Sequence, residues 1–279
     1  MEVDLIWFPF FFFAGKVLVV TGLETGYNPS SLKSEVIDLS SEDTVCGELG
    51  DFPLNISGAV GTLLGDYPVI CGGYTAGWVT NKCYKLNEAK QYTEFATMQK
   101  PRDYAGIIPH ENKVWITGGE NEKHQRIKTT EFILASGIST PGPDLPIALE
   151  KHAMAKVDLS ISMIIGGYSY DNDLTYDNTW YFEHHTEKFS DGPRLLEERC
   201  DHTAGVIKDS VFTDEKRVVV VGGFNSGSTL KSVEWLVSDK WEQGNSKFVN
   251  ASQNILMPSP SASSKFVLSV LKFLGILKF

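Results

Sequence analysis

The six histidines are the side chains of this 279-residue sequence best suited to bind a metal ion or to transfer a proton. His184 and His185 are adjacent at an expected strand end, where neighbouring side chains point to opposite faces, so one shared ion is disfavoured. His152 and His202 recur at equivalent places in two similar segments, which indicates a structural role. We therefore predict no metal site at the histidines.

An acidic segment, residues 171–177 (DNDLTYD), begins like a calcium-binding loop. Such a loop needs Gly at its sixth position, where Tyr176 stands, and a closing Glu at its twelfth, where Phe182 stands. We predict a solvated acidic loop at this place.

The sequence also lacks the G-x-S-x-G, H-E-x-x-H, P-loop and paired C-x-x-C patterns of common catalytic and cofactor sites. Its net charge of −10 disfavours nucleic acid as a partner, because binding to phosphates needs clustered Lys and Arg. No apolar run approaches the ~20 residues that span a bilayer. We predict a non-enzymatic protein with no catalytic residue, no cofactor and no transmembrane span.

The cysteines offer a different chemistry. Cys71 precedes a pair of glycines and Cys83 lies in the next expected strand, so a hairpin centred on Gly77 places the two opposite one another. Direct opposition is compatible with a disulfide. The alternative is that all the cysteines are reduced thiols that pack as small apolar side chains.

The cellular location follows from these patterns only in part. Asn55 and Asn250 begin N-x-S acceptor sequences, which together with a Cys71–Cys83 disulfide favour an extracellular protein over the cytoplasmic alternative. Residues 1–15 contain an apolar run of signal-peptide length but carry acidic residues where positive charge is expected. They are either a cleaved signal or the first inner strand.

Glycine residues divide the chain into a repeating pattern. Four glycine pairs, and an incomplete fifth copy, each follow a short apolar run at intervals of about 50 residues. Glycine is needed there because the chain turns at positive φ or passes close to a neighbouring backbone. The glycines of the pattern are Gly22, Gly72, Gly73, Gly118, Gly119, Gly166, Gly167, Gly222 and Gly223.

Each repeat divides into four short strands. In the second repeat these are residues 56–64, 67–71, 82–87 and 92–97. Four antiparallel strands per period, joined by glycine and proline turns, are typical of a propeller blade. A blade has apolar side chains on both faces, so it is stable only between two neighbours.

Residues 16–245 resemble the kelch family, whose signature is a glycine pair after an apolar strand, followed by spaced aromatic residues. The resemblance implies an all-β fold, a kelch-type β-propeller with five recognisable four-stranded blades and a degenerate sixth left open. Large rings, including Trp180, Trp235 and Trp241, are expected to fill the wedges between blades. The tail, residues 246–279, departs from the pattern.

One face of such a propeller is the expected binding surface. In an up-and-down blade, the turn between the second and third strands and the connection to the next blade emerge on the same face. Loops there vary in chemistry while the strands repeat, and they carry the aromatic residues enriched at interfaces. The predicted partner-binding residues are Tyr74, Trp78, His124, Arg126, Tyr168, Tyr170, Asp171, Asp173, Tyr176, Asp177 and Phe224.

We therefore predict a non-enzymatic scaffold that binds a protein partner through this loop face. Two alternatives remain. The resemblance extends to galactose-oxidase-like enzymes, which hold copper with tyrosines and histidines, but no residue here matches that site. A secreted propeller that binds a glycan fits the aromatic loops and the N-x-S sequences.

Overall fold

The computed structural model describes residues 5–6, 10–13, 16–24, 30–38, 49–171, 173–208 and 216–244. Every regular element in these ranges is a β-strand, which confirms the predicted all-β class. No helix in the described ranges has the length and hydropathy needed to cross a membrane. Asn250 and the tail 246–279 lie outside the described residues.

Most strands of the described residues form five four-stranded antiparallel sheets, here numbered 1 to 5 along the chain. Sheet 1 contains β1 (Leu5–Ile6), β2 (Phe10–Phe13), β3 (Lys16–Glu24) and β4 (Ser30–Asp38). Sheet 2 contains β6 (Val60–Leu64), β7 (Tyr67–Cys71), β10 (Lys82–Leu86) and β11 (Tyr92–Thr97). Sheet 3 contains β12 (Gly106–His110), β13 (Lys113–Thr117), β14 (Thr130–Leu134) and β15 (Ser139–Gly142).

Sheet 4 contains β16 (Ala153–Lys156), β17 (Ile161–Ile165), β20 (Thr179–Glu183) and β21 (Lys188–Asp191). Sheet 5 contains β22 (Thr203–Lys208), β23 (Lys216–Val221), β26 (Val233–Val237) and β27 (Lys240–Gln243). In sheets 2 to 5 the strands pair in chain order, as expected for an up-and-down blade. In sheet 1, β1 and β2 both pair with β3, which also pairs with β4.

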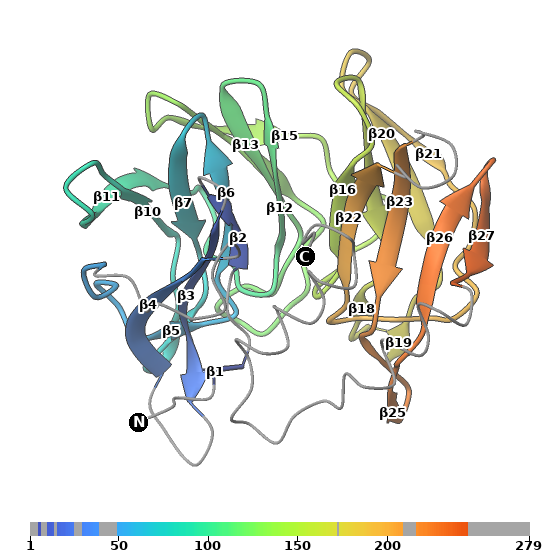
Figure 1. Ribbon diagram of the computed structural model, residues 1–279, viewed down its shortest axis with the longest axis horizontal. Helices are drawn as coiled ribbons and strands as arrows, with labels where there is room; N and C mark the ends of the chain where they lie inside the picture. Colours follow the sequence, from blue (N-terminus) through green and yellow to red (C-terminus); the bar gives the residue numbers. More distant parts are fainter. Residues whose placement is uncertain are drawn as a thin grey trace.

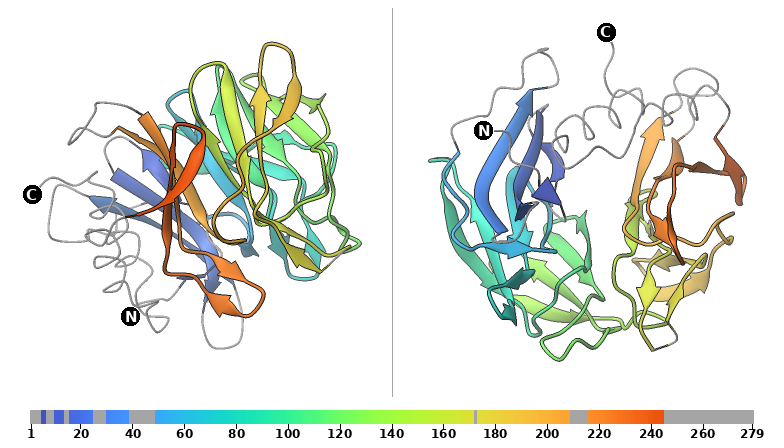
Figure 2. Two further views of the ribbon diagram at one scale, coloured as in Figure 1. Left: turned by 90° about the vertical axis from the view of Figure 1, so that its right-hand side faces the viewer. Right: turned by 90° about the horizontal axis from the view of Figure 1, so that it is seen from below.

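The sheets follow one another in chain order around an arc, as the right-hand view of Figure 2 shows. The first strand of each sheet from 2 to 5 contacts the first strand of its neighbour, and β2 of sheet 1 contacts β6. The first strands therefore lie near a common centre, and the last strands of sheets 2 to 5 lie on the outside (Figure 1).

Each of sheets 2, 3 and 4 packs against a different neighbour on each of its two faces. In β7, Ile70 belongs to a buried cluster with residues of sheet 1, whereas Val69 and Cys71 belong to a cluster with residues of sheet 3. The same alternation occurs in β13, where Trp115 faces sheet 4 and its two neighbours face sheet 2. Because side chains alternate along a strand, an uninterrupted apolar run is required wherever both faces are covered.

The glycine pairs are needed for both reasons inferred from the sequence. Gly72 and Gly73 have φ values of +68° and +101°, and the other three pairs also have positive φ. A Cβ on Gly72 would lie 2.2 Å from the carbonyl oxygen of Arg102, and one on Gly119 would lie 2.5 Å from that of Asp103. Gly22 differs, since it lies inside β3 next to a shift in register.

Two of the three tryptophans expected between blades lie where two described sheets meet. Trp180 and Trp241 are each 5% exposed and pack in the clusters between sheets 3 and 4 and between sheets 4 and 5. Trp235 is half-buried and packs against Val219 and Val233 of sheet 5.

Two buried arginines attach the connections between sheets to the next sheet. Arg102 donates to the carbonyl oxygens of Gly118 and Thr129, both at 2.8 Å, and forms an ion pair with Glu131 of β14 at 2.6 Å. Arg199 repeats this arrangement with the carbonyl oxygen of Gly222 and with Glu234 of β26.

The connections that lack this ion pair use an apolar pair at the same two positions. In the connection between sheets 3 and 4, Leu149 and Trp180 take the places of Arg and Glu, and both belong to one buried cluster. Ile56 and Tyr84 do the same between sheets 1 and 2. Ionic and apolar pairs therefore alternate along the arc.

The first prediction concerns this ion pair. Arg102→Leu should lower the free energy of unfolding by about 3–5 kcal/mol, because it leaves the Glu131 carboxylate buried without its cation. Arg102→Leu combined with Glu131→Gln should lose less, since the unpaired charge is gone. Urea denaturation of both variants measures the difference, and equal losses would contradict the explanation.

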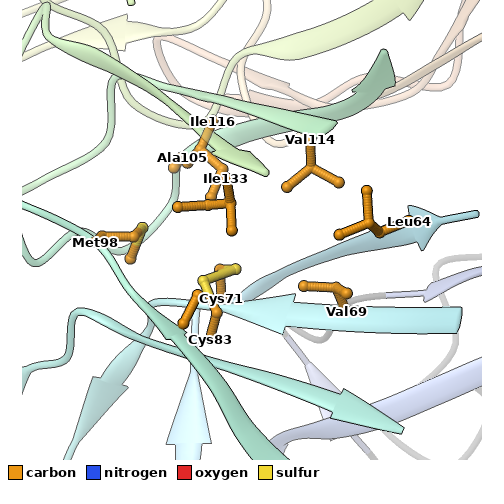
Figure 3. Close-up of a cluster of buried hydrophobic side chains, with 10 residues drawn as sticks. Leu64, Val69, Cys71, Cys83, Met98, Ala105, Val114, Ile116 and Ile133 are labelled. Atoms are coloured by element: carbon orange, nitrogen blue, oxygen red, sulfur yellow. A yellow bond between two sulfur atoms is a disulfide. The ribbon is translucent and has the colours of Figure 1, made fainter. Parts of the chain in front are cut away.

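A disulfide links Cys71 and Cys83, as predicted. The two residues are directly opposed in the register of β7 and β10, with their Cα atoms 4.1 Å apart. Both side chains belong to the cluster between sheets 2 and 3, where they lie across from Ile116 and Ile133 (Figure 3). Cys200 is a buried free thiol, and Cys46 lies outside the described residues.

The second prediction is that a non-reducing digest will contain a peptide cross-linked through Cys71 and Cys83. Replacing both residues with Ala should lower the free energy of unfolding by about 2–4 kcal/mol, because the bond restricts the unfolded chain. A Cys200→Ala variant is the control for loss of a buried sulfur alone. Alkylation of Cys71 and Cys83 without reductant would contradict the prediction.

Candidate functional site

Short hairpins gather at one end of the sheets, on a surface we call the hairpin face. They are formed by β8 (Tyr74–Thr75) with β9 (Trp78–Val79), β18 (Tyr168–Ser169) with β19 (Leu174–Thr175), and β24 (Phe224–Asn225) with β25 (Ser228–Thr229). Each lies between the second and third strands of its sheet. In Figure 1 the labels β18, β19 and β25 mark the lower end of sheets 4 and 5.

The connections that enter each sheet lie on the same face as these hairpins. The short strand β5 (Ile56–Ser57) pairs with β8. In the connections that enter sheets 4 and 5, isolated antiparallel β-bridges pair Glu150 with Tyr168 and Cys200 with Phe224. Connections and hairpins therefore lie on one face, as expected for an up-and-down blade, and backbone hydrogen bonds join them.

Four equivalent residues of these connections form a chain of hydrogen bonds that we call the inner ladder. Gly58, Tyr104, Lys151 and Asp201 each lie two residues before the first strand of their sheet. The amide of Tyr104 donates to the carbonyl of Gly58 at 2.8 Å, Lys151 to Tyr104 at 2.8 Å, and Asp201 to Lys151 at 3.0 Å. The ladder links sheets 2 to 5 near their common centre.

All four ladder residues have positive φ, with values of 64°, 48°, 55° and 51° along the chain. For residues with a Cβ this backbone conformation costs roughly 1–2 kcal/mol each. Only Gly58 avoids the cost, and a Cβ there would meet the ring of Tyr104 at 3.0 Å. Strained residues of this kind cluster at functional sites, so the ladder marks a place to look for one.

The ladder side chains contact one another in sequence. The Lys151 Nζ atom lies 4.9 Å from the centre of the Tyr104 ring and 3.5 Å from the Asp201 carboxylate. Burial raises the pKa of the Asp201 carboxyl, and the nearby Lys151 ammonium opposes that rise.

Two carboxylates hold Arg126 beside the ladder, and a third, that of Asp103, lies next to them. The Arg126 guanidinium lies 3.1 Å from Glu120 and 2.9 Å from Glu150, and the His124 ring contacts Glu120 from the other side. Asp103 is 3% exposed and its backbone pairs with that of Glu120. The cluster therefore holds more carboxylates than cations.

Burial and the like charges of the cluster change the protonation of Asp103. Burial raises its pKa to about 7, and the Glu120 and Glu150 carboxylates add to the rise. Burial also raises the pKa of Glu150, against the opposing effect of Arg126. The Oδ1 atom of Asp103 and the Oε2 atom of Glu150 make no hydrogen bond within the described structure.

A pocket of about 500 Å³ opens on the hairpin face beside this cluster. The structure brings together in its lining five of the residues predicted from the sequence, namely Arg126, Tyr168, Tyr170, Asp173 and Phe224. It adds Glu150, Lys151 and Asp201, which sequence reasoning missed. Their residue types do not recur in the other repeats, so the only signal was their position two or three residues before the first strand of a sheet.

The remaining predicted residues lie outside the pocket lining. Tyr74 and Trp78 are exposed on the β8–β9 hairpin, and His124 and Asp171 are exposed on neighbouring loops. Tyr176 is half-buried and packs against the cluster between sheets 3 and 4. Asp177 forms an ion pair with Arg194 at 2.6 Å.

The histidines considered first lie elsewhere. His152 is buried with its Nε2 atom 2.7 Å from the Thr117 hydroxyl, and His184 stacks on His110 with ring centres 3.6 Å apart. Within the described ranges, no group of three His, Cys, Asp or Glu side chains is placed to hold a metal ion.

Comparison with known proteins identifies the fold. No protein-family model matches the sequence, and a search of curated proteins finds no match. Among solved structures, one described as "Structure of YjhT" is similar with a TM-score of 0.68 over 86% of this chain and 84% of the other. With 10% sequence identity, the likeness establishes a β-propeller-like fold and nothing about activity.

The third prediction follows from the pKa of Asp103. Because the folded state holds this proton more tightly than the unfolded state, Asp103 favours folding below about pH 4 and loses that contribution as pH rises towards 7. Each unit of pKa shift corresponds to about 1.4 kcal/mol. Asp103→Asn should therefore flatten the decline of stability between pH 4 and 7.

Thermal unfolding measured across this pH range tests the effect. The exposed Asp171→Asn is the matched control and should leave the slope of the native protein unchanged. Parallel curves for native protein and Asp103→Asn would show that Asp103 titrates normally.

Proposed function

We propose that this protein is a non-enzymatic kelch-type scaffold that binds a protein partner on its hairpin face. The observation that carries the proposal is the position of the exposed large apolar side chains. Five of those in the described chain lie on the three short hairpins: Tyr74, Trp78, Tyr170, Leu174 and Phe224. Their exposed fractions run from 38% to 64%.

Such exposure is costly for a surface that stays in water. Trp78 is 57% exposed and Tyr170 is 64% exposed, although both are large enough to be buried with considerable gain. Aromatic residues are enriched among the residues that contribute most to protein binding. Rigid hairpins, held by pairing with the connections, present these rings without a large loss of chain entropy on binding.

The disulfide supports an extracellular location for this scaffold. Bonds such as Cys71–Cys83 form and persist mainly in oxidising compartments. An extracellular partner is therefore the natural target of an affinity search.

The fourth prediction is that Trp78→Ala, Tyr170→Ala and Phe224→Ala together weaken binding of a captured protein partner at least tenfold. The reason is that interface aromatics commonly contribute 2 kcal/mol or more each by alanine substitution, about thirtyfold in affinity. A partner captured by cross-linking from an extracellular fraction should be purified, and its dissociation constant measured by biolayer interferometry.

A variant with Ile138→Ala and Leu159→Ala is the matched control, since both residues are exposed and apolar but lie off the hairpins. It should bind as the native protein does. Circular dichroism must show the same fold for all three proteins. Equal affinity of the triple variant and the native protein would exclude the hairpin face as the binding surface.

A further inference from the structure

We propose that the pocket on the hairpin face receives a basic side chain, Lys or Arg, from the protein partner. This inference rests on the proposed function and specifies the chemistry of the partner at one point. The pocket lies between the β18–β19 and β24–β25 hairpins and the ladder residues Lys151 and Asp201.

The charges lining the pocket favour a cation. Three carboxylates, Glu150, Asp173 and Asp201, line it together with two cations, Arg126 and Lys151. Both cations already have acidic partners. Arg126 is held between Glu120 and Glu150, and Lys151 lies beside Asp201.

A buried acceptor in the lining lacks a donor. Glu150 is 2% exposed, its Oε1 atom accepts from Arg126 at 2.9 Å, and its Oε2 atom makes no hydrogen bond within the described structure. Leaving a buried carboxylate oxygen unpaired is costly, and a hydrogen-bond donor from a ligand would remove that cost. The Nε atom of Arg126 also lacks a hydrogen-bond acceptor, but the surrounding carboxylates would repel an anion at that place.

The aromatic lining suits a cation as well. The Arg126 guanidinium already lies 4.6 Å from the ring centre of Tyr170 and 5.8 Å from that of Tyr168. These rings therefore stabilise a positive charge at this place in the free protein. Tyr170 and Phe224 are 64% and 45% exposed, so both remain available to an incoming side chain.

Size and overall charge agree with this assignment. A pocket of about 500 Å³ lies within the usual range for sites that enclose a small ligand group. The net charge of −10 attracts a basic partner from a distance and speeds its association.

The fifth prediction uses Nα-acetyl-argininamide and Nα-acetyl-lysinamide as probes of the purified full chain, with Nα-acetyl-glutaminamide as the neutral control. At least one cationic probe should bind in a calorimetric or NMR titration, and the neutral probe should bind at least tenfold more weakly. Glu150→Gln should weaken the cationic probe at least tenfold, because it removes the buried charge and keeps the side-chain shape.

Two further variants guard against a folding effect. Asp173→Asn changes an exposed lining residue whose left-handed backbone Asn tolerates, and it should weaken the cationic probe about threefold to tenfold. Glu122→Gln changes an exposed carboxylate outside the lining and should leave binding unchanged.

The outcomes separate this inference from the proposed function. No binding of either cationic probe, or binding that both Glu150→Gln and Asp173→Asn leave unchanged, overturns the pocket assignment even if a partner still depends on the hairpin aromatics. Cation binding that requires Glu150 supports the assignment. If that result came with a partner indifferent to the hairpin aromatics, the assignment of the pocket would stand and the hairpin face would fail as the main interface.

Discussion

The structure depends on one constraint, which is that a sheet with apolar side chains on both faces needs a neighbour on each of them. Val69 and Ile70 are adjacent in β7, yet they pack against different neighbouring sheets. A single blade would expose the apolar side chains of both faces to water, at about 25 cal/mol for each Å². Neighbouring blades therefore hold each other in place, and their connections and hairpins are brought to a common face.

The side-chain pairs at each connection add specific contacts to this packing. Arg102 with Glu131 and Arg199 with Glu234 bond the incoming chain to the next sheet, whereas Leu149 with Trp180 achieves the same by burial. The connections next to the inner ladder are thus held firmly enough to keep strained residues at positive φ.

The elements of the fold were largely predictable because their signals are local. Glycine pairs end the second strands, and Cys71 and Cys83 are symmetric about Gly77, so the strands and the disulfide followed from spacing along the chain. The pocket was predictable only in part. Successive blades place their connections side by side, and this brings together Glu150, Lys151 and Asp201. A sequence motif within one blade does not show how close two connections lie. Burial of Tyr176 likewise depends on sheet 3, which precedes it in the chain.

A repeated backbone can produce a site that is not repeated. The four ladder positions share one backbone conformation and one pattern of hydrogen bonds, so the chain can change their side chains without changing the scaffold. It uses Gly58 in sheet 2, where Tyr104 covers the backbone, and then Lys151 and Asp201, whose opposite charges pair across sheets 4 and 5. Charge is therefore concentrated on one side of the centre, where the carboxylate cluster and the exposed rings of Tyr170 and Phe224 also lie. Specificity in such a scaffold arises from the differences between blades, since any feature common to all of them serves the packing that every blade requires.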